Sequence, residues 1–376
     1  MYERLTAIRR ALAEAPTWAI ADRLAEQVAK EYDVLDVELL LVDYRLGALV
    51  PLRGGEPHTH PGSPGWRSFD HQSELAADDA LFLPVTARGD RLGVLRVAPA
   101  VVDRADVAEL AEVAEMLAHE LSAAWAKTDR YAAGARVRRL TLAAEMQWEL
   151  LPGRSCVRPA FSLAGQLEPA YAVRGDGFDW SDDAGRLAVA VVNGMGEGVA
   201  AAMLTTLAIS ALRNARRAGL PLADQAALAD QAVYAHHGGA AHVEALLLEL
   251  DLRTGEVTIV DAGSPRLMLL RDGEVGEQRL EAQLPLGMFE DTIYQPQRMA
   301  LRTGDRLLVL SDGVFDAAST SSRYGESALD RFVRRTRSLA PLEAVRSLLG
   351  DLRAFVGGEL VDDAVVVCLD WAGPRG

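Results

Sequence analysis

The sequence predicts an α+β protein with two domains and a connector between them, and three observations carry this prediction. The chain has 376 residues, whereas a single domain usually holds roughly 100–200 residues. Its first third combines helical periodicity with a strand hairpin. From Phe161 onward, short apolar runs are separated by Gly and Asp turns and interrupted by a few helical stretches. Such a pattern predicts two sheets flanked by helices in the second domain.

The N-terminal portion shows four kinds of element. A stretch rich in Gly, Pro and His predicts an exposed loop, and we expect His58 and His60 within it to be loop residues rather than haem or metal ligands. The elements expected in chain order are a helix over 6–31, a strand over 37–44, the loop over 53–66, and a hairpin of strands 81–85 and 92–97 turning at 88–90.

A long helical pattern follows the hairpin and leads into the second half. It runs from Asp103 to about Leu151, is weak around 132–134, and is stopped by Pro152 and Gly153. A long amphipathic helix between two domains usually packs against a second copy or transmits strain, so we predict a connector helix over 126–152 and a homodimer. The alternative is that the two helical segments, before and after 132–134, each pack only against the domain to which they belong.

The second half predicts strands and helices in alternation, without an internal repeat. The expected strands are 187–192, 245–251, 256–261, 267–270, 306–311 and 364–369, and the expected helices are 199–218, 223–234 and 341–355.

Composition excludes several functions. The formal charge of -15 argues against a nucleic-acid partner and is compatible with binding cations or basic protein surfaces. Cys156 and Cys368 form no zinc-type cluster, which suits a reducing compartment. The N-terminus has charges where a signal peptide needs an apolar run, and no apolar stretch reaches the roughly 18–20 residues of a spanning helix. We therefore expect a cytoplasmic protein without a membrane partner.

Acidic and amide side chains stand at the ends of the predicted strands in the second half, each beside a glycine or a turn. They are Asp176 and Asp179 before one strand, Asn193 after it, Asp312 after another, and Asp362 and Asp363 before the last. Oxygen ligands on rigid supports suit hard divalent cations, and two such ions can activate water for phosphoryl transfer. The alternative is that Asp-Gly after a strand is ordinary turn chemistry.

Seven short segments of the second half form an ordered series: 143–152, 173–179, 193–198, 262–265, 285–287, 311–314 and 362–364. In order and spacing they resemble the entering helix, the VGGDxFD turn, the D-x-S/M-G-x-G loop and the AGHPP, PLG, TDGV and DDAT motifs of the SpoIIE/RsbU branch of PPM-type phosphatases, in its actinobacterial form. The likeness runs from about Ala143 to Trp371.

The first half resembles a GAF domain, through Leu83-Pro84-Val85 and the run 91–95. Together the two resemblances imply a GAF-like sensor domain over 1–125, the connector helix over 126–152, and a PPM-type αββα sandwich over 153–376.

The resemblance also implies a site and a reaction. Asp176, Asp312 and Asp363 would be metal carboxylates, Asn193 would stand at the bridging position, and Gly194 would offer a backbone carbonyl. Two Mn²⁺ or Mg²⁺ ions would activate water for direct attack on phosphorus. The implied substrate is a phosphoserine or phosphothreonine on a STAS-type anti-sigma-factor antagonist or a similar regulator.

Asn193 departs from the family, which has an aspartate at the bridging position. Removing one charge a few Å from two dications costs on the order of several kcal/mol, and each ~1.4 kcal/mol is tenfold in affinity. Arg174, Glu197 and Ser264 also replace family residues, normally Gly, Lys or His, and His.

Three interpretations stay open. The protein is an active or attenuated phosphatase, a pseudophosphatase that binds a partner without turnover, or a second-messenger receptor acting through its first domain. An active enzyme would need the missing charge from Glu197, from Asp179, or from deamidation of Asn193-Gly194.

Overall fold

A computed structural model describes residues 2–101, 103–169, 173–319, 322–358 and 360–374. The chain divides into two compact units, Met1–Arg139 and Leu140–Gly376. Each unit has a buried apolar core of its own.

The N-terminal unit is built on a five-stranded antiparallel sheet in the order β2-β1-β5-β4-β3. Its strands are β1 (Asp36–Val42), β2 (Leu49–Pro51), β3 (Leu75–Ala77), β4 (Ala80–Ala87) and β5 (Asp90–Ala98). Its helices are α1 (Tyr2–Glu14), α2 (Ile20–Tyr32), α3 (Pro64–His71), α4 (Arg104–Ala124) and α5 (Asp129–Gly134), with 3-10 turns η1 (Thr17–Ala19) and η2 (Trp125–Lys127).

The predicted hairpin is confirmed as β4 and β5, and two other predictions for this unit need correction. The helix expected over 6–31 is two helices, because Pro16 separates α1 from α2. The loop expected over 53–66 ends inside α3, where Trp66 is only 1% exposed and its indole N–H donates to the His58 carbonyl at 2.8 Å.

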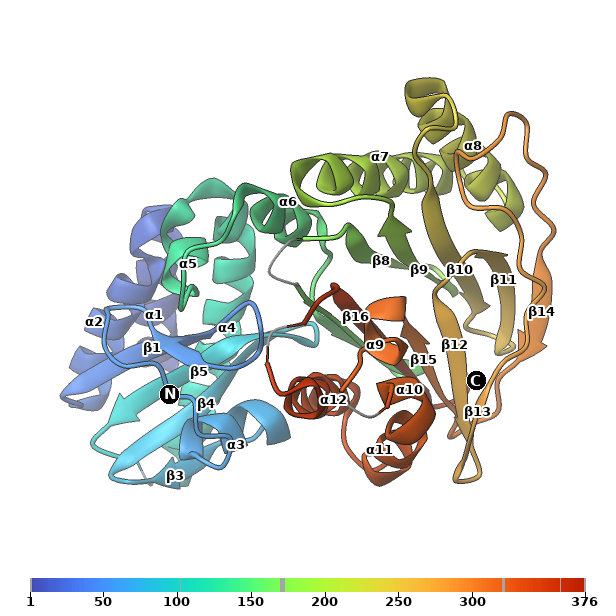
Figure 1. The fold of residues 1–376 in the computed structure, drawn as a ribbon. Coiled ribbons are helices and arrows are strands. Elements are labelled where there is room, and N and C mark those ends of the chain that lie inside the picture. The colour runs from blue at the N-terminus through green and yellow to red at the C-terminus, as the bar shows by residue number, and fades with distance from the viewer. Residues whose placement is uncertain (1, 102, 170–172, 320–321, 359, 375–376) are drawn as a thin grey trace. The chain divides into compact units, whose positions relative to one another are not determined.

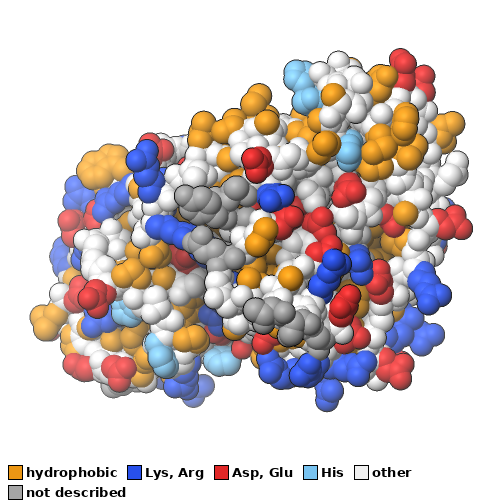
Figure 2. Space-filling model, viewed as in Figure 1, with side chains coloured by type: hydrophobic (Ala, Val, Ile, Leu, Met, Phe, Trp, Pro, Cys, Tyr) orange, Lys and Arg blue, Asp and Glu red, His pale blue; other side chains and the backbone are white. Residues whose placement is uncertain are grey.

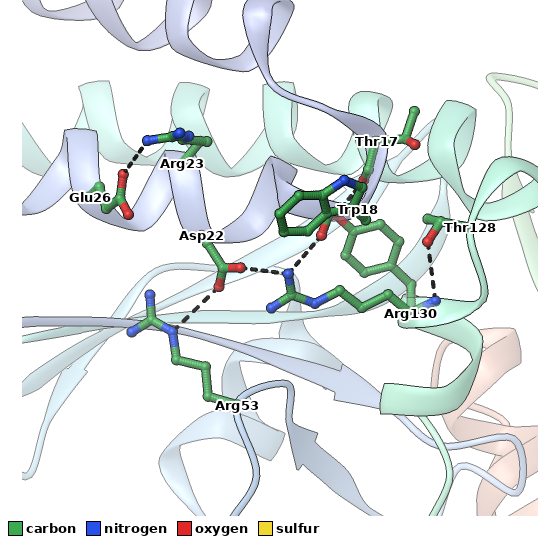
Figure 3. A network of polar contacts seen from close by, with 9 residues as sticks. Thr17, Trp18, Asp22, Arg23, Glu26, Arg53, Thr128 and Arg130 are labelled. Carbon is green, nitrogen blue, oxygen red and sulfur yellow. Dashed lines mark hydrogen bonds and ion pairs between the residues drawn. The ribbon is translucent and has the colours of Figure 1, made fainter.

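The single connector helix predicted over 126–152 is wrong. That range holds the end of η2, then α5, a non-helical segment over 135–141, and α6 (Leu142–Leu150). The physical reason is that α5 folds back onto the N-terminal unit: Arg130 donates to the Trp18 carbonyl at 2.7 Å and to the Asp22 carboxylate at 2.5 Å (Figure 3). Buried Tyr131 donates to the Thr17 carbonyl at 2.8 Å.

The C-terminal unit contains two antiparallel sheets, in the orders β14-β11-β10-β9-β8 and β13-β12-β15-β16-β7-β6. The strands are β6 (Ser155–Val157), β7 (Phe161–Glu168), β8 (Asp176–Asp183), β9 (Arg186–Gly194), β10 (Val243–Asp251), β11 (Glu256–Ala262), β12 (Arg266–Arg271), β13 (Glu274–Glu277), β14 (Gln297–Ala300), β15 (Arg306–Leu310) and β16 (Ala364–Trp371). The helices are α6, α7 (Gly198–Arg217), α8 (Leu222–His237), α9 (Asp312–Phe315), α10 (Tyr324–Ser327), α11 (Leu329–Arg335) and α12 (Pro341–Val356).

These sheets lie face to face, which confirms the predicted αββα sandwich. Alternate apolar residues of both sheets line one internal cavity, among them Leu187, Leu248, Val309 and Val367. Helices α7 and α8 cover the outer side of one sheet, and α12 covers the outer side of the other (Figure 1). All six strands and all three helices predicted for this half match elements of the unit, with the predicted ends at 311 and 218 one residue beyond β15 and α7.

Helix α7 is long and apolar enough, by length and composition, to span a membrane, and no other helix in the described part of the chain passes this test. It packs against β9 and α8. Near its end, Arg213 and Arg216 both bind Asp179 of β8. These contacts are those of a helix that belongs to the sandwich.

The docking of α5 gives a prediction for stability. The substitution Tyr131→Ala should lower the free energy of unfolding by about 3–5 kcal/mol, because it removes a fully buried aromatic side chain. Urea denaturation of the full chain measures this loss. The control is Trp18→Ala, whose side chain is 58% exposed and whose loss should be about 0.5 kcal/mol. Equal losses in the two variants would contradict the packing described for α5.

Candidate metal centre

The candidate centre begins with a row of three polar residues on adjacent strands. Asp176 of β8 pairs directly with Asn193 of β9, and Asn193 pairs directly with Glu244 of β10. Residues opposite each other in an antiparallel pair carry their side chains on the same face. The row therefore presents two carboxylates with an amide between them.

Strand periodicity shows which face of the sheet carries this row. The side chain of Phe178, two residues after Asp176, packs over Gly165 of the other sheet, where an added Cβ would lie 2.5 Å from the ring. Leu187 and Val189 lie on the same face of β9 as Asn193, because they are an even number of residues away, and both line the internal cavity. The polar row therefore lies on the inner face, where the apolar core of the sandwich ends.

The second sheet brings its own acidic residues to the same end. Asp312 follows β15, and Asp363 precedes β16. The Asn193 amide donates to the Asp312 carboxylate, Nδ2 to Oδ1, at 2.9 Å. Behind Asp312 the backbones are so close that a Cβ on Gly313 would lie 1.8 Å from the Asp363 carbonyl oxygen. The sequence-predicted residues Asp176, Asn193, Asp312 and Asp363 are thus neighbours, although β8 and β16 lie far apart in the chain.

Asp363 is fully buried, and its carboxylate binds protein donors. Its Oδ2 accepts from the backbone N–H of Arg174 at 2.7 Å, from that of Gly175 at 3.1 Å, and from Gln147 Nε2 at 2.9 Å. Gln147 Nε2 also donates to the Asp176 carbonyl at 2.9 Å. Asp363 therefore fixes the loop before β8 and the helix α6, a role that the sequence did not indicate.

Asp176 has the opposite character. Its side chain is fully buried, and within the described ranges neither carboxylate oxygen accepts a hydrogen bond of normal geometry, although the Ser311 hydroxyl lies near enough to favour the ionised form and so to lower the pKa of Asp176. Burial, followed by the charges of Asp363 and Asp312, holds the pKa of Asp176 well above its ordinary value. A buried carboxylate without a partner is costly, so this group is suited to a cation or a proton.

Asp362 belongs to this site, although sequence reasoning chose its neighbour Asp363. Burial first, and then the charge of Asp362, raise the pKa of Asp312 to about 6. The pKa of Asp362 is itself raised by burial, while the Arg174 guanidinium opposes the rise. Asp362 therefore lies near Asp312, and the Arg174 guanidinium lies near Asp362. The signal in the sequence was the doubled aspartate directly before β16.

Gly194 lies where the turn after β9 meets the loop before β8. Its N–H donates to the Gly175 carbonyl at 3.0 Å, and a Cβ on Gly175 would lie 2.4 Å from the Gly194 carbonyl oxygen. The positive φ of 95° at Gly175 also favours glycine. The role of the Gly194 carbonyl as a metal ligand stays a prediction.

Of the two side chains expected to compensate for Asn193, Asp179 is excluded. It is 2% exposed and binds Arg213 at 2.8 Å and Arg216 at 2.9 Å, so its charge is already neutralised. Glu197 is exposed at the start of α7 and makes no capping hydrogen bond.

The carboxylate and amide oxygens of the centre are the ligand types that a hard divalent cation prefers, but they do not lie in the arrangement of a complete coordination site. Carboxylates gather on the face of the C-terminal unit between α7 and α9, with a few basic side chains beside them (Figure 2). Among the described residues, no group of three or more His, Cys, Asp or Glu side chains has the arrangement of a metal site. Binding would therefore require side chains such as Asp312 to turn away from their present protein donors.

Comparison with known proteins gives one family. A family model described as Stage II sporulation protein E (SpoIIE) matches residues 183–372, half of the chain. Asn193, Asp312 and Asp363 lie within the match, whereas Gln147 and Asp176 precede it. None of the curated proteins compared with the chain matches it.

Solved structures show the same fold. One contains the RsbU and RsbW domains of a Mycobacterium tuberculosis protein, with a TM-score of 0.50 and 23% identity, covering 60% of this chain and 63% of that one. Another contains the PP2C phosphatase domain and a regulatory fragment of SpoIIE from Bacillus subtilis, with a TM-score of 0.52 and 19% identity, covering 58% of this chain and 64% of that one. This chain thus spans less than two thirds of either protein, and at these identities the likeness concerns the fold.

The bonds of Gln147 give a second prediction for stability. The substitution Gln147→Met should lower the free energy of unfolding by about 1.5–3 kcal/mol, because it removes a hydrogen bond to a buried charged group. The matched control is Gln225→Met, since Gln225 is also buried but donates to a neutral carbonyl, that of Leu220, at 2.8 Å. Its loss should be about 0.5–1.5 kcal/mol by urea denaturation. A loss for Gln147→Met no larger than that of the control would contradict the role assigned to Gln147.

The raised pKa of Asp312 predicts a pH dependence of stability in cation-free protein. The folded state, with its pKa of about 6, binds the proton more tightly than the unfolded chain does. This contribution is therefore complete below the unfolded pKa of about 4 and is lost as the pH rises through about 6. Unfolding free energies measured between these pH values in a chelator should fall more steeply for the wild type than for Asp312→Asn. Parallel curves would show that Asp312 titrates normally.

Proposed function

The chain belongs to the SpoIIE family, and from this premise we propose that its C-terminal unit is a metal-dependent protein serine/threonine phosphatase. The observation that carries the proposal is the buried, unpartnered carboxylate of Asp176 beside Asp312, at the open end of the sandwich. Oxygen ligands of this kind are those that Mn²⁺ and Mg²⁺ prefer.

In the proposed reaction, Asp176, Asp312 and Asp362 hold the cations, and the Asp363 carboxylate keeps the loop before β8 in place. A bound divalent cation lowers the pKa of water and neutralises charge on the phosphoryl group. The Arg174 guanidinium, which faces Asp362, supplies hydrogen-bond donors for a phosphate oxygen. Hydrolysis would then proceed by attack of water on phosphorus, with release of the serine or threonine hydroxyl.

The proposed substrate is a phosphorylated protein, such as a STAS-type anti-sigma-factor antagonist or a similar regulator. Met195, Val199 and Met203 expose 52%, 39% and 57% of their surface and follow Asn193 directly in the chain. Exposed apolar side chains beside a polar site favour a protein partner over a small phosphate ester. One of the similar structures combines RsbU with RsbW domains, which fits a partner-switching role.

For the N-terminal unit we propose a GAF-like sensor that controls the phosphatase in a cytoplasmic homodimer. In its support, the unit has a five-stranded antiparallel sheet with its own helices and its own core. Such control cannot act through one continuous helix, because the chain is non-helical between α5 and α6.

A pseudophosphatase is the second candidate, and one contact favours it. The Asn193 Nδ2 donates to Asp312 Oδ1, so a protein donor occupies an oxygen that a cation would use. A domain of this kind would bind the phosphorylated regulator and release it unchanged.

The substitution Asn193→Asp distinguishes the two candidates. It should tighten Mn²⁺ binding by about tenfold or more and raise phosphate release, since it adds one charge close to the cations. Release of inorganic phosphate from a phosphoserine peptide is followed while Mn²⁺ is titrated into freshly prepared protein, in which deamidation has not begun.

The matched control is Asn214→Asp, because Asn214 is exposed on α7 and acquires the same charge away from the site. It should behave as the wild type does. Release by both the wild type and Asn193→Asp supports the phosphatase, whereas release by the Asn193→Asp variant alone supports the pseudophosphatase. Absence of release from every protein at saturating Mn²⁺ would contradict the proposed reaction.

A further inference from the structure

Glu244 is an acidic side chain of the centre to which neither the resemblance nor the proposed reaction assigns a role. It is the direct cross-strand neighbour of Asn193, on the side opposite to Asp176. Leu248 and Leu250 lie an even number of residues further along β10, so they share its face with Glu244, and both line the internal cavity. Glu244 therefore points to the inner face, towards the same end of the sandwich as Asn193.

The aliphatic part of the Glu244 side chain is packed against Gly263, whereas its carboxylate is free to bind a ligand. Gly263, at φ 144°, passes so close that a Cβ there would lie 2.5 Å from the Glu244 Cβ. In the parts of the chain that the structure describes, the Glu244 carboxylate makes no hydrogen bond or ion pair, and the side chain is half-buried. The negative charge of Glu244 is also one of those that act on Asp312.

Asp176 gives the independent sign that a cation belongs at this end. Its carboxylate is fully buried, lies on the same face as Glu244, and has neither oxygen bound to a protein donor. Acidic side chains alone would be compatible with a solvated rim. A buried carboxylate that accepts no hydrogen bond of normal geometry, on the far side of Asn193, is stabilised by a proton or by a cation, and a cation beside the row would supply that charge without protonation.

We propose that Glu244 supplies the carboxylate that Asn193 lacks, so that Glu244 joins Asp176, Asp312 and Asp362 in the cation site of this chain, with the missing charge displaced by one strand from the family position. The inference rests on the proposed metal-dependent function, although it concerns cation binding and not turnover. An Asn in the middle of the row keeps a neutral oxygen for the ion, while the negative charge is moved from β9 to β10.

The geometry favours this assignment over the two compensations expected from the sequence. The Asp179 charge is neutralised by Arg213 and Arg216, and Glu197 lies beyond the end of β9. Glu244 alone among these three acidic residues stands in direct register with Asn193. A glutamate is also longer than an aspartate by one methylene, so its carboxylate can reach past the position of its own strand.

The test is a double-mutant cycle on the full chain, with cation binding as the readout. Mn²⁺ affinity is measured by isothermal titration calorimetry for the wild type, Glu244→Gln, Asn193→Asp and the double variant, and circular dichroism confirms folding. Glu244→Gln should weaken Mn²⁺ binding at least tenfold. In the Asn193→Asp background the same substitution should have a much smaller effect, because Asp at 193 restores the charge. The control is Glu249→Gln on the same strand, which pairs with Arg186 at the other end of β10 and should leave Mn²⁺ affinity unchanged.

The outcomes separate this inference from the proposed function. A tenfold loss of Mn²⁺ affinity in Glu244→Gln supports the inference even if the protein releases no phosphate, in which case only the proposed reaction fails. Wild-type affinity in Glu244→Gln, or equal losses in both backgrounds, would overturn it. A wild-type protein that binds no Mn²⁺ at millimolar concentration would overturn it as well.

Discussion

The C-terminal unit depends on one buried ion-dipole contact, the carboxylate of Asp363 bound by two backbone N–H groups and the Gln147 amide. Hydrogen bonds to a charged acceptor contribute about 1.5–3 kcal/mol, and a buried carboxylate without them would be strongly unfavourable. The contact joins three parts of the chain that no strand pairing connects: β16, the loop before β8, and α6. The same contact therefore holds the end of β16 beside the strand that carries Asp176.

The acidic side chains of the site are arranged in two classes. Asp363 and Asp179 are buried and bound by protein donors, neutral ones for Asp363 and two arginines for Asp179, so they act on structure. Asp176, Asp312, Asp362 and Glu244 keep charge that the protein only partly offsets, through Asn193 and Arg174. Burial raises the pKa values of the first three of these, and neighbouring carboxylates, Asp363 among them, add to the rise. A divalent cation compensates the buried negative charge and reduces the repulsion between carboxylates. A proton does the same only at a pH low enough to protonate them.

Periodicity predicted most of the sandwich, because buried strands such as β9, β10 and β16 are continuous apolar runs bounded by turns. It missed β8, whose sequence is mostly polar beyond Phe178, since the strand is identified by its pairing with β9. It also missed β6, β7, β13 and β14. The clustering of Asp176, Asn193, Asp312 and Asp363 followed from motif order. Motif order did not distinguish the roles of Asp362 and Asp363, and it could not find Glu244, whose place beside Asn193 depends on cross-strand register. The break after α5 escaped prediction because it depends on distant partners such as Asp22 and Thr17.

Asn193 can be understood from the same balance of charges. An aspartate at this position would stand directly between Asp176 and Glu244 in the strand register and at hydrogen-bond distance from Asp312. In the absence of a cation, four carboxylates would then repel one another at one end of the sandwich, at a cost of several kcal/mol for close pairs at an effective dielectric near 20. The amide removes one charge and donates to Asp312 instead. The chain therefore gains stability in its cation-free state, and whatever affinity for cations it retains must come from carboxylates on the neighbouring strands.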